Sequence, residues 1–204
     1  MTYLSEKPKN PITLSTLAKY KKSGEKFSCL TCYDASFAHL MGQVGIDTIL
    51  VGDSLGMVVQ GQSSTLPVTV ADMVYHTQNV ARANSHALIL TDLPFMSYAT
   101  LSDAVANARA VMQAGANVVK IEGGGELAEI VSTLAKNGVP TCVHLGLTPQ
   151  SVNVFGGYKV QGKTDEQAEK LLKDCEILVN AGASIILLEC VPAELAKTVT
   201  ERFN

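Results

Sequence analysis

Four apolar segments of this chain end on an acidic side chain that packing alone does not require. The segments are Ile49–Asp53, Leu88–Asp92, Val118–Glu122 and Ile185–Glu189. Short apolar runs of this kind predict strands of a parallel sheet that are buried on both faces. In parallel α/β proteins, ligands bind at the carboxyl ends of the strands. The sequence therefore predicts a cluster of carboxylates at the ligand-binding end of a sheet.

The first three of these acids suit a hard divalent cation. Carboxylate oxygens with no neighbouring Cys/His cluster favour Mg²⁺. Asp53 and Asp92 end adjacent strands, so their carboxylates should converge, and Glu122 can reach the same ion directly or through water. A helix or loop cap is the ordinary role of one such aspartate, but three acids on successive strands favour the metal site.

Other polar residues near these strand ends extend the site. Lys120 precedes Glu122 by two residues and projects from the same side of its strand. A lysine facing an apolar interior needs a partner, for which a bound carboxylate is suitable. Ser54 offers a hydroxyl and an N–H, although alone it would be a turn residue. These residue types predict an Mg²⁺-assisted enzyme that neutralises a small α-oxo acid and stabilises its enolate.

Two residues of the later strands each have two alternative roles. Glu189 is either a general base or an outer partner of the site. His144 ends its apolar run, and we weigh two roles equally: a buried ring satisfied by a backbone carbonyl, or a member of the site.

The elements that must position these residues form six strand–helix repeats. The expected strands span residues 27–31, 47–51, 87–90, 118–121, 141–144 and 184–188. The expected helices span residues 13–23, 35–43, 70–83, 102–113, 165–180 and 192–202, and one more ends at residue 136. Thr69 and Ser102 are the expected N-caps of the third and fourth helices. Long loops are expected at residues 52–67 and 146–164. Chemistry spread over several strands favours a barrel, because a doubly wound sheet would place a glycine fingerprint after its first strand. We predict one α/β domain over residues 1–204, a (β/α)8 TIM barrel with six βα units present and the last two lacking.

Composition excludes several classes of protein. The 204 residues carry 16 basic and 19 acidic side chains with no basic face, which argues against nucleic acid and anionic membranes as partners. No apolar stretch approaches the ~20 residues that cross a bilayer, and the polar N-terminus predicts a cytoplasmic protein.

The five cysteines do not indicate a disulfide framework. We interpret Cys29 and Cys32 as small buried hydrophobic residues rather than a redox or zinc pair.

Six motifs carry a resemblance to a known family. They are Val51–Met57 (VGDSLGM), Asp92–Met96 (DLPFM), Lys120–Gly124 (KIEGG), His144–Gln150 (HLGLTPQ), Phe155–Gly162 (FGGYKVQG) and Leu188–Pro192 (LECVP). In order and without large gaps, from about residue 13 to residue 202, the chain resembles ketopantoate hydroxymethyltransferase.

This resemblance implies a barrel of the phosphoenolpyruvate/pyruvate type and a specific reaction. A one-carbon unit would pass from 5,10-methylenetetrahydrofolate to 3-methyl-2-oxobutanoate, giving ketopantoate for pantothenate and coenzyme A synthesis. Matched by motif, the metal ligands would be Asp53, Asp92 and Glu122, the keto-acid contacts Asp53, Ser54, Asp92 and Lys120, and the proton acceptor Glu189, with His144 nearby in an open role. The family forms cytoplasmic homo-oligomers, commonly decamers.

Two other functions stay open at this point. An isocitrate-lyase-like, Mg²⁺-dependent lyase or mutase would share the barrel, but its catalytic cysteine loop is not found in this sequence. A catalytically inert keto-acid-binding protein would follow if truncation had removed part of the site. Family members continue for about two further βα units, so we expect the natural polypeptide to be longer than 204 residues.

Overall fold

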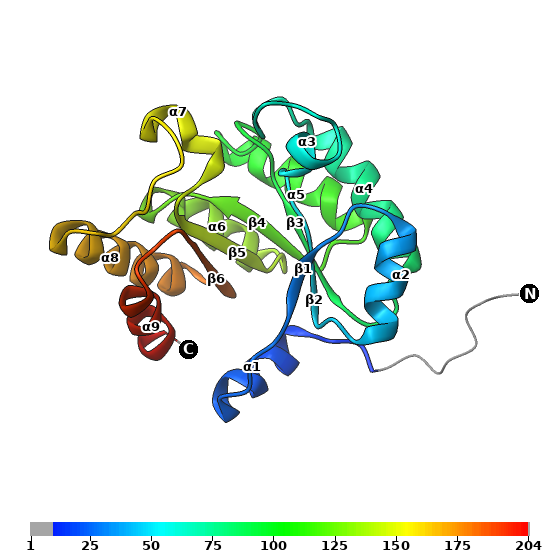
Figure 1. Ribbon diagram of the computed structural model, residues 1–204, viewed down its shortest axis with the longest axis horizontal. Helices are drawn as coiled ribbons and strands as arrows, with labels where there is room; N and C mark the ends of the chain where they lie inside the picture. Colours follow the sequence, from blue (N-terminus) through cyan, green and yellow to red (C-terminus); the bar gives the residue numbers. More distant parts are fainter. Residues whose placement is uncertain (1–9, 204) are drawn as a thin grey trace, which may run out of the picture.

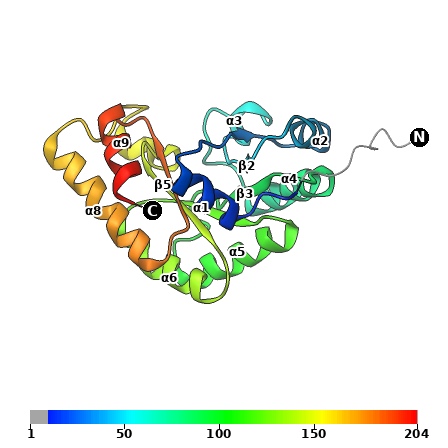
Figure 2. The ribbon, with the colours of Figure 1, turned by 90° about the horizontal axis from the view of Figure 1, so that it is seen from below.

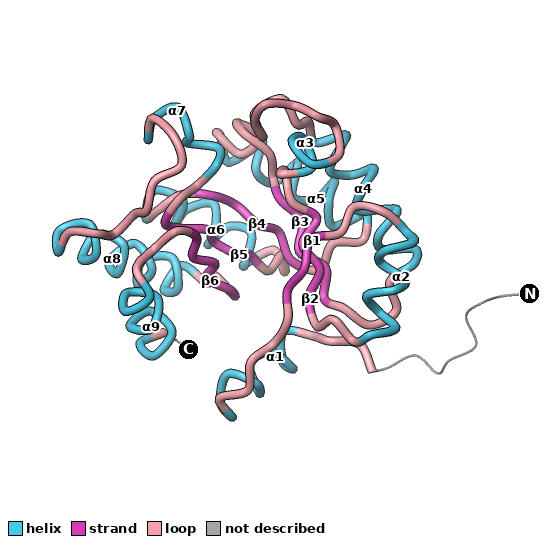
Figure 3. The backbone as a smooth tube through the Cα atoms, viewed as in Figure 1, coloured by secondary structure: helices cyan, strands magenta, loops and turns pink. Residues whose placement is uncertain are grey.

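Six parallel strands form the framework of the structure, a computed structural model that describes residues 10–203. They are β1 (Cys29–Thr31), β2 (Thr48–Val51), β3 (Leu88–Asp92), β4 (Val118–Glu122), β5 (Thr141–Gly146) and β6 (Ile185–Glu189). Each strand pairs with the next along the chain, in the order β1-β2-β3-β4-β5-β6. The sheet curls into a half-barrel (Figure 1) and runs as one row of strands between the helices (Figure 3).

Helices cover the outer side of the curved sheet. They are α2 (Ala35–Val44), α4 (Val70–Ala83), α5 (Leu101–Ala114), α6 (Ala128–Lys136), α8 (Asp165–Ala181) and α9 (Ala193–Arg202). Seen from below, they form an arc around the strands, and α1 (Leu14–Ser23) lies on the inner side of that arc (Figure 2). This arrangement of consecutive parallel βα units is the predicted TIM-barrel fold in partial form.

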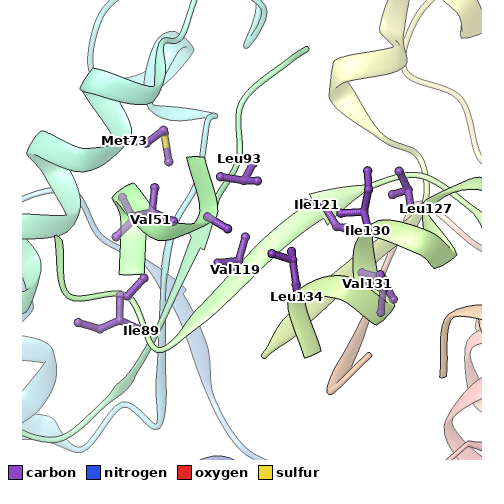
Figure 4. Close-up of a cluster of buried hydrophobic side chains, with 14 of the residues drawn as sticks. Val51, Met73, Ile89, Leu93, Val119, Ile121, Leu127, Ile130, Val131 and Leu134 are labelled. Atoms are coloured by element: carbon purple, nitrogen blue, oxygen red, sulfur yellow. The ribbon is translucent and has the colours of Figure 1, made fainter. Parts of the chain in front are cut away.

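Residues alternate between two cores along each strand. The outward-facing positions, such as Val119 and Ile121, pack with helix residues such as Met73 and Val131 in the larger core (Figure 4). The inward-facing positions form a smaller core with α1, which buries Leu17. Burying a side chain of this size stabilises the fold by roughly 1.5–3 kcal/mol. Since alternate residues share a face, the inward positions that continue toward the strand ends are those of the ionisable residues.

The strand and helix boundaries differ from the prediction in a few places. The first strand begins at Cys29 rather than residue 27. Ser28, just before it, bonds the Asp47 carboxylate through its N–H and its hydroxyl, each at 2.8 Å. Thr69 caps α4 as predicted. The predicted cap at Ser102 is wrong: α5 is capped by Thr100, whose hydroxyl accepts from the Asp103 N–H at 3.2 Å.

The two long loops at the carboxyl ends of the strands contain short helical turns. These are α3 (Leu55–Val58) after β2, and η2 (Pro149–Ser151) with α7 (Val152–Phe155) after β5. A further turn, η1 (Gly125–Leu127), leads from β4 into α6. Single helical turns lack the long periodicity that sequence patterns detect.

The cysteines are free thiols in the described part of the chain. Cys32 is buried as predicted, but Cys29 is exposed because it lies on β1, whose three residues are all exposed. Among residues 10–203, no helix combines the length and the apolar character needed to cross a membrane.

Candidate active site at the carboxyl ends of the strands

Strand register brings the ionisable residues of the site side by side. Asp92 of β3 pairs with Lys120 of β4, and Glu122 of β4 pairs with His144 of β5. Glu189 of β6 pairs with Gly146, the last residue of β5. Parallel strands keep paired residues on one face. The side chains of Asp92, Lys120, Glu122 and His144 therefore form one continuous polar row, and Glu189 lies at its end.

Asp53 and Asp92 lie at one end of this row. The Asp53 N–H, directly after β2, donates to Asp92 Oδ2 at 2.9 Å. Lys120 Nζ lies 2.6 Å from Asp92 Oδ1 and 3.3 Å from Glu122 Oε1. The contact to Asp92 is an ion pair without an aligned hydrogen bond, so this buried oxygen has no well-directed donor.

Three buried carboxylates surround the single lysine. Burial opposes the charge of Lys120, but the charges of Asp92, Glu122 and Asp53 outweigh it and raise the lysine pKa. Burial, together with the negative charge of Asp92, raises the pKa of Asp53 to about 8. The site therefore has an excess of negative charge that one lysine does not neutralise.

Glu122, His144 and Glu189 form the other end of the row. His144 Nδ1 lies 3.0 Å from Glu122 Oε1, and Nε2 lies 3.5 Å from Glu189 Oε2. Burial would raise the pKa of Glu122, but the hydrogen bond from His144 and the charge of Lys120 reverse this and lower it. The Glu189 side chain is 44% exposed, whereas that of His144 is only 2% exposed. Of the acids in the site, Glu189 is thus the most exposed to solvent.

Three further residues belong to the site although sequence patterns did not single them out. Gln150 and Tyr98 hydrogen-bond to each other and to the acids. The hydroxyls of Tyr33 and Ser54 share a hydrogen bond of 2.8 Å, which turns Ser54 toward the loop after β1. Gln150 ends the motif His144–Gln150 that carries the family resemblance, but no role was assigned to it, and Tyr98 has no periodic context.

The donor set fits a hard divalent cation. Within residues 10–203, no three His, Cys, Asp or Glu side chains are grouped so that they could hold an ion by themselves. Asp53 and Asp92 nevertheless offer buried carboxylate oxygens at the ends of neighbouring strands, one of them without an aligned donor, in surroundings that favour a positive charge. Mg²⁺ ordinarily takes one or two protein carboxylates and completes its shell with water and substrate.

Two cavities are relevant to ligand binding. A cavity of about 300 Å³ adjoins the acids and is lined by Phe95, Tyr98, Glu122, Glu126 and Gln150, among others. A larger one of about 550 Å³ lies at the opposite end of the strands, between α1 and the start of β3. The larger cavity contains no carboxylate, and the smaller one meets the acidic row only at Glu122, so the side-chain contacts rather than either cavity define the site.

The fold and the site together define a (β/α) barrel protein with acid and lysine chemistry at its strand ends. Two solved structures share the fold: 2,3-dimethylmalate lyase, at 16% identity and a TM-score of 0.67, covering 94% of this chain and 69% of that one; and phosphonopyruvate hydrolase in complex with oxalate and Mg²⁺, at 12% identity and a TM-score of 0.66, covering 87% and 63%. At these identities the likeness concerns the fold alone.

Sequence comparison is more specific. A protein of Psychrobacter sp. (strain PRwf-1) named 3-methyl-2-oxobutanoate hydroxymethyltransferase is 73% identical over 190 residues, which cover 93% of this chain and 70% of that protein. The profile of the family described as ketopantoate hydroxymethyltransferase matches residues 11–204. The chain belongs to the ketopantoate hydroxymethyltransferase family, as the sequence motifs predicted.

Proposed function

We propose that this protein transfers a hydroxymethyl group from 5,10-methylenetetrahydrofolate to 3-methyl-2-oxobutanoate, giving ketopantoate, with Mg²⁺ as its cofactor. The name of the Psychrobacter relative supports the keto-acid substrate. The observation that carries the proposal is the buried lysine between Asp92 and Glu122, with Asp53 beside it, at the carboxyl ends of the strands. This arrangement suits a small anionic ligand that arrives together with a divalent cation.

Asp53 and Asp92 would hold the metal, and Glu122 would reach it directly or through water. Lys120 and Ser54, with the two aspartates, would contact the keto acid. When bound, Mg²⁺ supplies a Lewis acid that polarises a carbonyl oxygen and favours loss of a proton beside it. The ammonium group of Lys120 adds fixed positive charge in a site from which water is largely excluded, where electrostatic stabilisation is strongest. Oxalate and Mg²⁺ bind together in phosphonopyruvate hydrolase, which has the same fold.

Glu189 would accept the proton from C3 of the keto acid. Asp53, Asp92 and Glu122 are each engaged by buried partners, and Glu189 is the acid that is partly open to solvent. The C3 carbon would then form the new bond to the one-carbon unit. His144 lies between two acids, with Nδ1 3.0 Å from Glu122 Oε1 and Nε2 3.5 Å from Glu189 Oε2, so its ring would hold Glu189 in place beside the substrate.

A turnover assay with purified protein tests this function. We expect ketopantoate to form from 3-methyl-2-oxobutanoate and 5,10-methylenetetrahydrofolate, and its formation to stop when EDTA is added and resume with excess Mg²⁺. Cleavage of 2,3-dimethylmalate without ketopantoate formation would instead establish a lyase. Binding of the keto acid with neither reaction would establish an inert binding protein.

A further inference from the structure

Gln150 connects the two ends of the acidic row. Its side chain is buried in the turn η2, and Nε2 donates to Asp53 Oδ2 at 2.8 Å and to the Leu93 carbonyl at 3.0 Å. Its backbone N–H donates to Glu122 Oε2 at 3.1 Å. One residue of the loop after β5 thus fixes acids that follow β2 and end β4. Among residues 10–203, Gln150 is the one hydrogen-bond donor to the Asp53 carboxylate.

Tyr98 fixes the orientation of the Gln150 amide. Its hydroxyl has two acceptors within reach of its proton, Gln150 Oε1 at 2.6 Å and the Glu122 carbonyl at 3.1 Å, and it accepts the Glu122 N–H at 3.2 Å. A flipped amide would place Oε1 against Asp53 Oδ2 and the Leu93 carbonyl, which are both acceptors. The network therefore permits one orientation of the amide, with both hydrogens of Nε2 committed.

We propose that Gln150 is a positioning residue that holds the Asp53 carboxylate in place for the divalent cation, and that Tyr98 acts by locking the Gln150 amide. The inference rests on the proposed function, in which Asp53 is a metal ligand. Neither residue is assigned a contact with the metal or a role in proton transfer. Groups that orient metal ligands typically contribute about 10- to 100-fold to metal affinity.

A purely structural role for these residues gives a different expectation. If Gln150 only anchored the loop after β5 to the sheet, its replacement would lower thermal stability and leave the intrinsic metal affinity of the folded protein unchanged. Metal affinity and melting temperature, measured on the same variants, therefore separate the two roles. Because Tyr98 is assigned an effect that passes through Gln150, the two substitutions should not act independently.

The test uses the full chain and Mn²⁺ as a spectroscopic probe for the divalent site. Free Mn²⁺ is measured by electron paramagnetic resonance, without substrates, in the wild type, Q150M, Y98F and the double variant. The matched controls are Q113M and Y75F, at exposed positions of α5 and α4. Circular dichroism melts of the metal-free proteins report folding.

We expect Q150M to raise the Mn²⁺ dissociation constant by about 10- to 100-fold. Y98F should raise it by a smaller factor, the double variant should match Q150M alone, and the controls should match the wild type. If Q150M does not fold, Y98F provides the test, because it retains the Gln150 donors and removes the hydroxyl that contacts Gln150 Oε1 and the Glu122 backbone.

Three results would overturn the inference or part of it. Folded Q150M or Y98F with Mn²⁺ affinity within about twofold of the wild type would do so while leaving the proposed function intact, provided that D53N loses Mn²⁺. If the two substitutions raised the Mn²⁺ dissociation constant by factors that multiply in the double variant, Tyr98 would act independently of Gln150. A wild-type protein that binds no Mn²⁺ would overturn the metal part of the proposed function together with this inference.

Discussion

Lys120 and Asp92 form a buried ion pair across two neighbouring strands, with Nζ 2.6 Å from Oδ1 and both side chains at most 4% exposed. Removing one partner leaves the other as an uncompensated buried charge. We expect Lys120→Met to lower the free energy of unfolding by about 3–5 kcal/mol, the usual effect of breaking such a pair. Urea denaturation measures this change. The double variant Lys120→Met/Asp92→Asn should recover part of the loss, and a wild-type midpoint for Lys120→Met would contradict the prediction.

The metal assignment predicts separate effects on binding and on folding. Asp53→Asn and Asp92→Asn should each weaken Mg²⁺ and keto-acid binding while the fold persists, because each removes a full negative charge from the ligand end of a strand. Isothermal titration calorimetry measures both affinities. Asp165→Asn, at the exposed start of α8, is the control. Unchanged Mg²⁺ affinity in both site variants would end this assignment.

The raised pKa of Asp53 gives the metal-free protein a predictable pH dependence. Burial and the Asp92 charge raise this pKa to about 8, so between its ordinary value and about 8 the folded state holds a proton that the unfolded state releases. Stability should therefore fall as pH rises through that window. Urea denaturation at several pH values should show this decrease in the wild type and a flatter profile in Asp53→Asn.

The same proton competes with the metal for Asp53. Below a pH of about 8, Mg²⁺ affinity should weaken as pH falls, by at most about tenfold per pH unit for a single competing proton. Calorimetry across that range checks the slope. Affinity that is independent of pH would show that Asp53 is already ionised in the metal-free protein.

The open edge of the sheet predicts exposed apolar surface. Phe27 and Leu30 on and beside β1 are 42% and 47% exposed, and β1 pairs only with β2 among the described residues. We expect a protein of these 204 residues to bind ANS and to associate at high concentration. Leu30→Thr should reduce ANS fluorescence. A monodisperse protein with weak ANS binding would show that this edge is adequately shielded.

We also propose that the natural polypeptide contains two further βα units that complete the barrel. The Psychrobacter relative extends beyond the matched region, because 190 aligned residues are 70% of its length. Intact mass of the protein isolated from its natural source tests the proposal.

Local sequence predicted the framework of the site but not its connections. Alternation along the fourth strand predicted that Lys120 and Glu122 share a face, and both side chains are buried in the site. The partner of His144 could not be chosen from sequence, because its bond to Glu122 depends on the register between β4 and β5. Gln150 was missed for a similar reason: its contacts reach 97 residues along the chain to Asp53 from a loop without periodicity.

Glu189 provides the sharpest test of the proposed chemistry. Glu189→Gln keeps the shape of the side chain but cannot accept a proton, while the metal and lysine side of the site is unchanged. We therefore expect normal Mg²⁺ and keto-acid binding, with turnover lower by about 10²–10⁴-fold, the usual contribution of a general base. Glu194→Gln, an exposed acid five residues further along in α9, is the matched control and should behave as the wild type.

Proton exchange isolates the step assigned to Glu189. With Mg²⁺ but no folate, the wild-type protein should exchange the C3 hydrogen of 3-methyl-2-oxobutanoate with deuterated water, as followed by proton NMR. Glu189→Gln should lose this exchange, because removal of the C3 proton requires a base at that position. Exchange at the wild-type rate in Glu189→Gln would move the base elsewhere in the site. His144 would then be the next candidate, since its Nε2 faces the same region at 3.5 Å from Glu189 Oε2 and has no hydrogen-bond partner among the described residues.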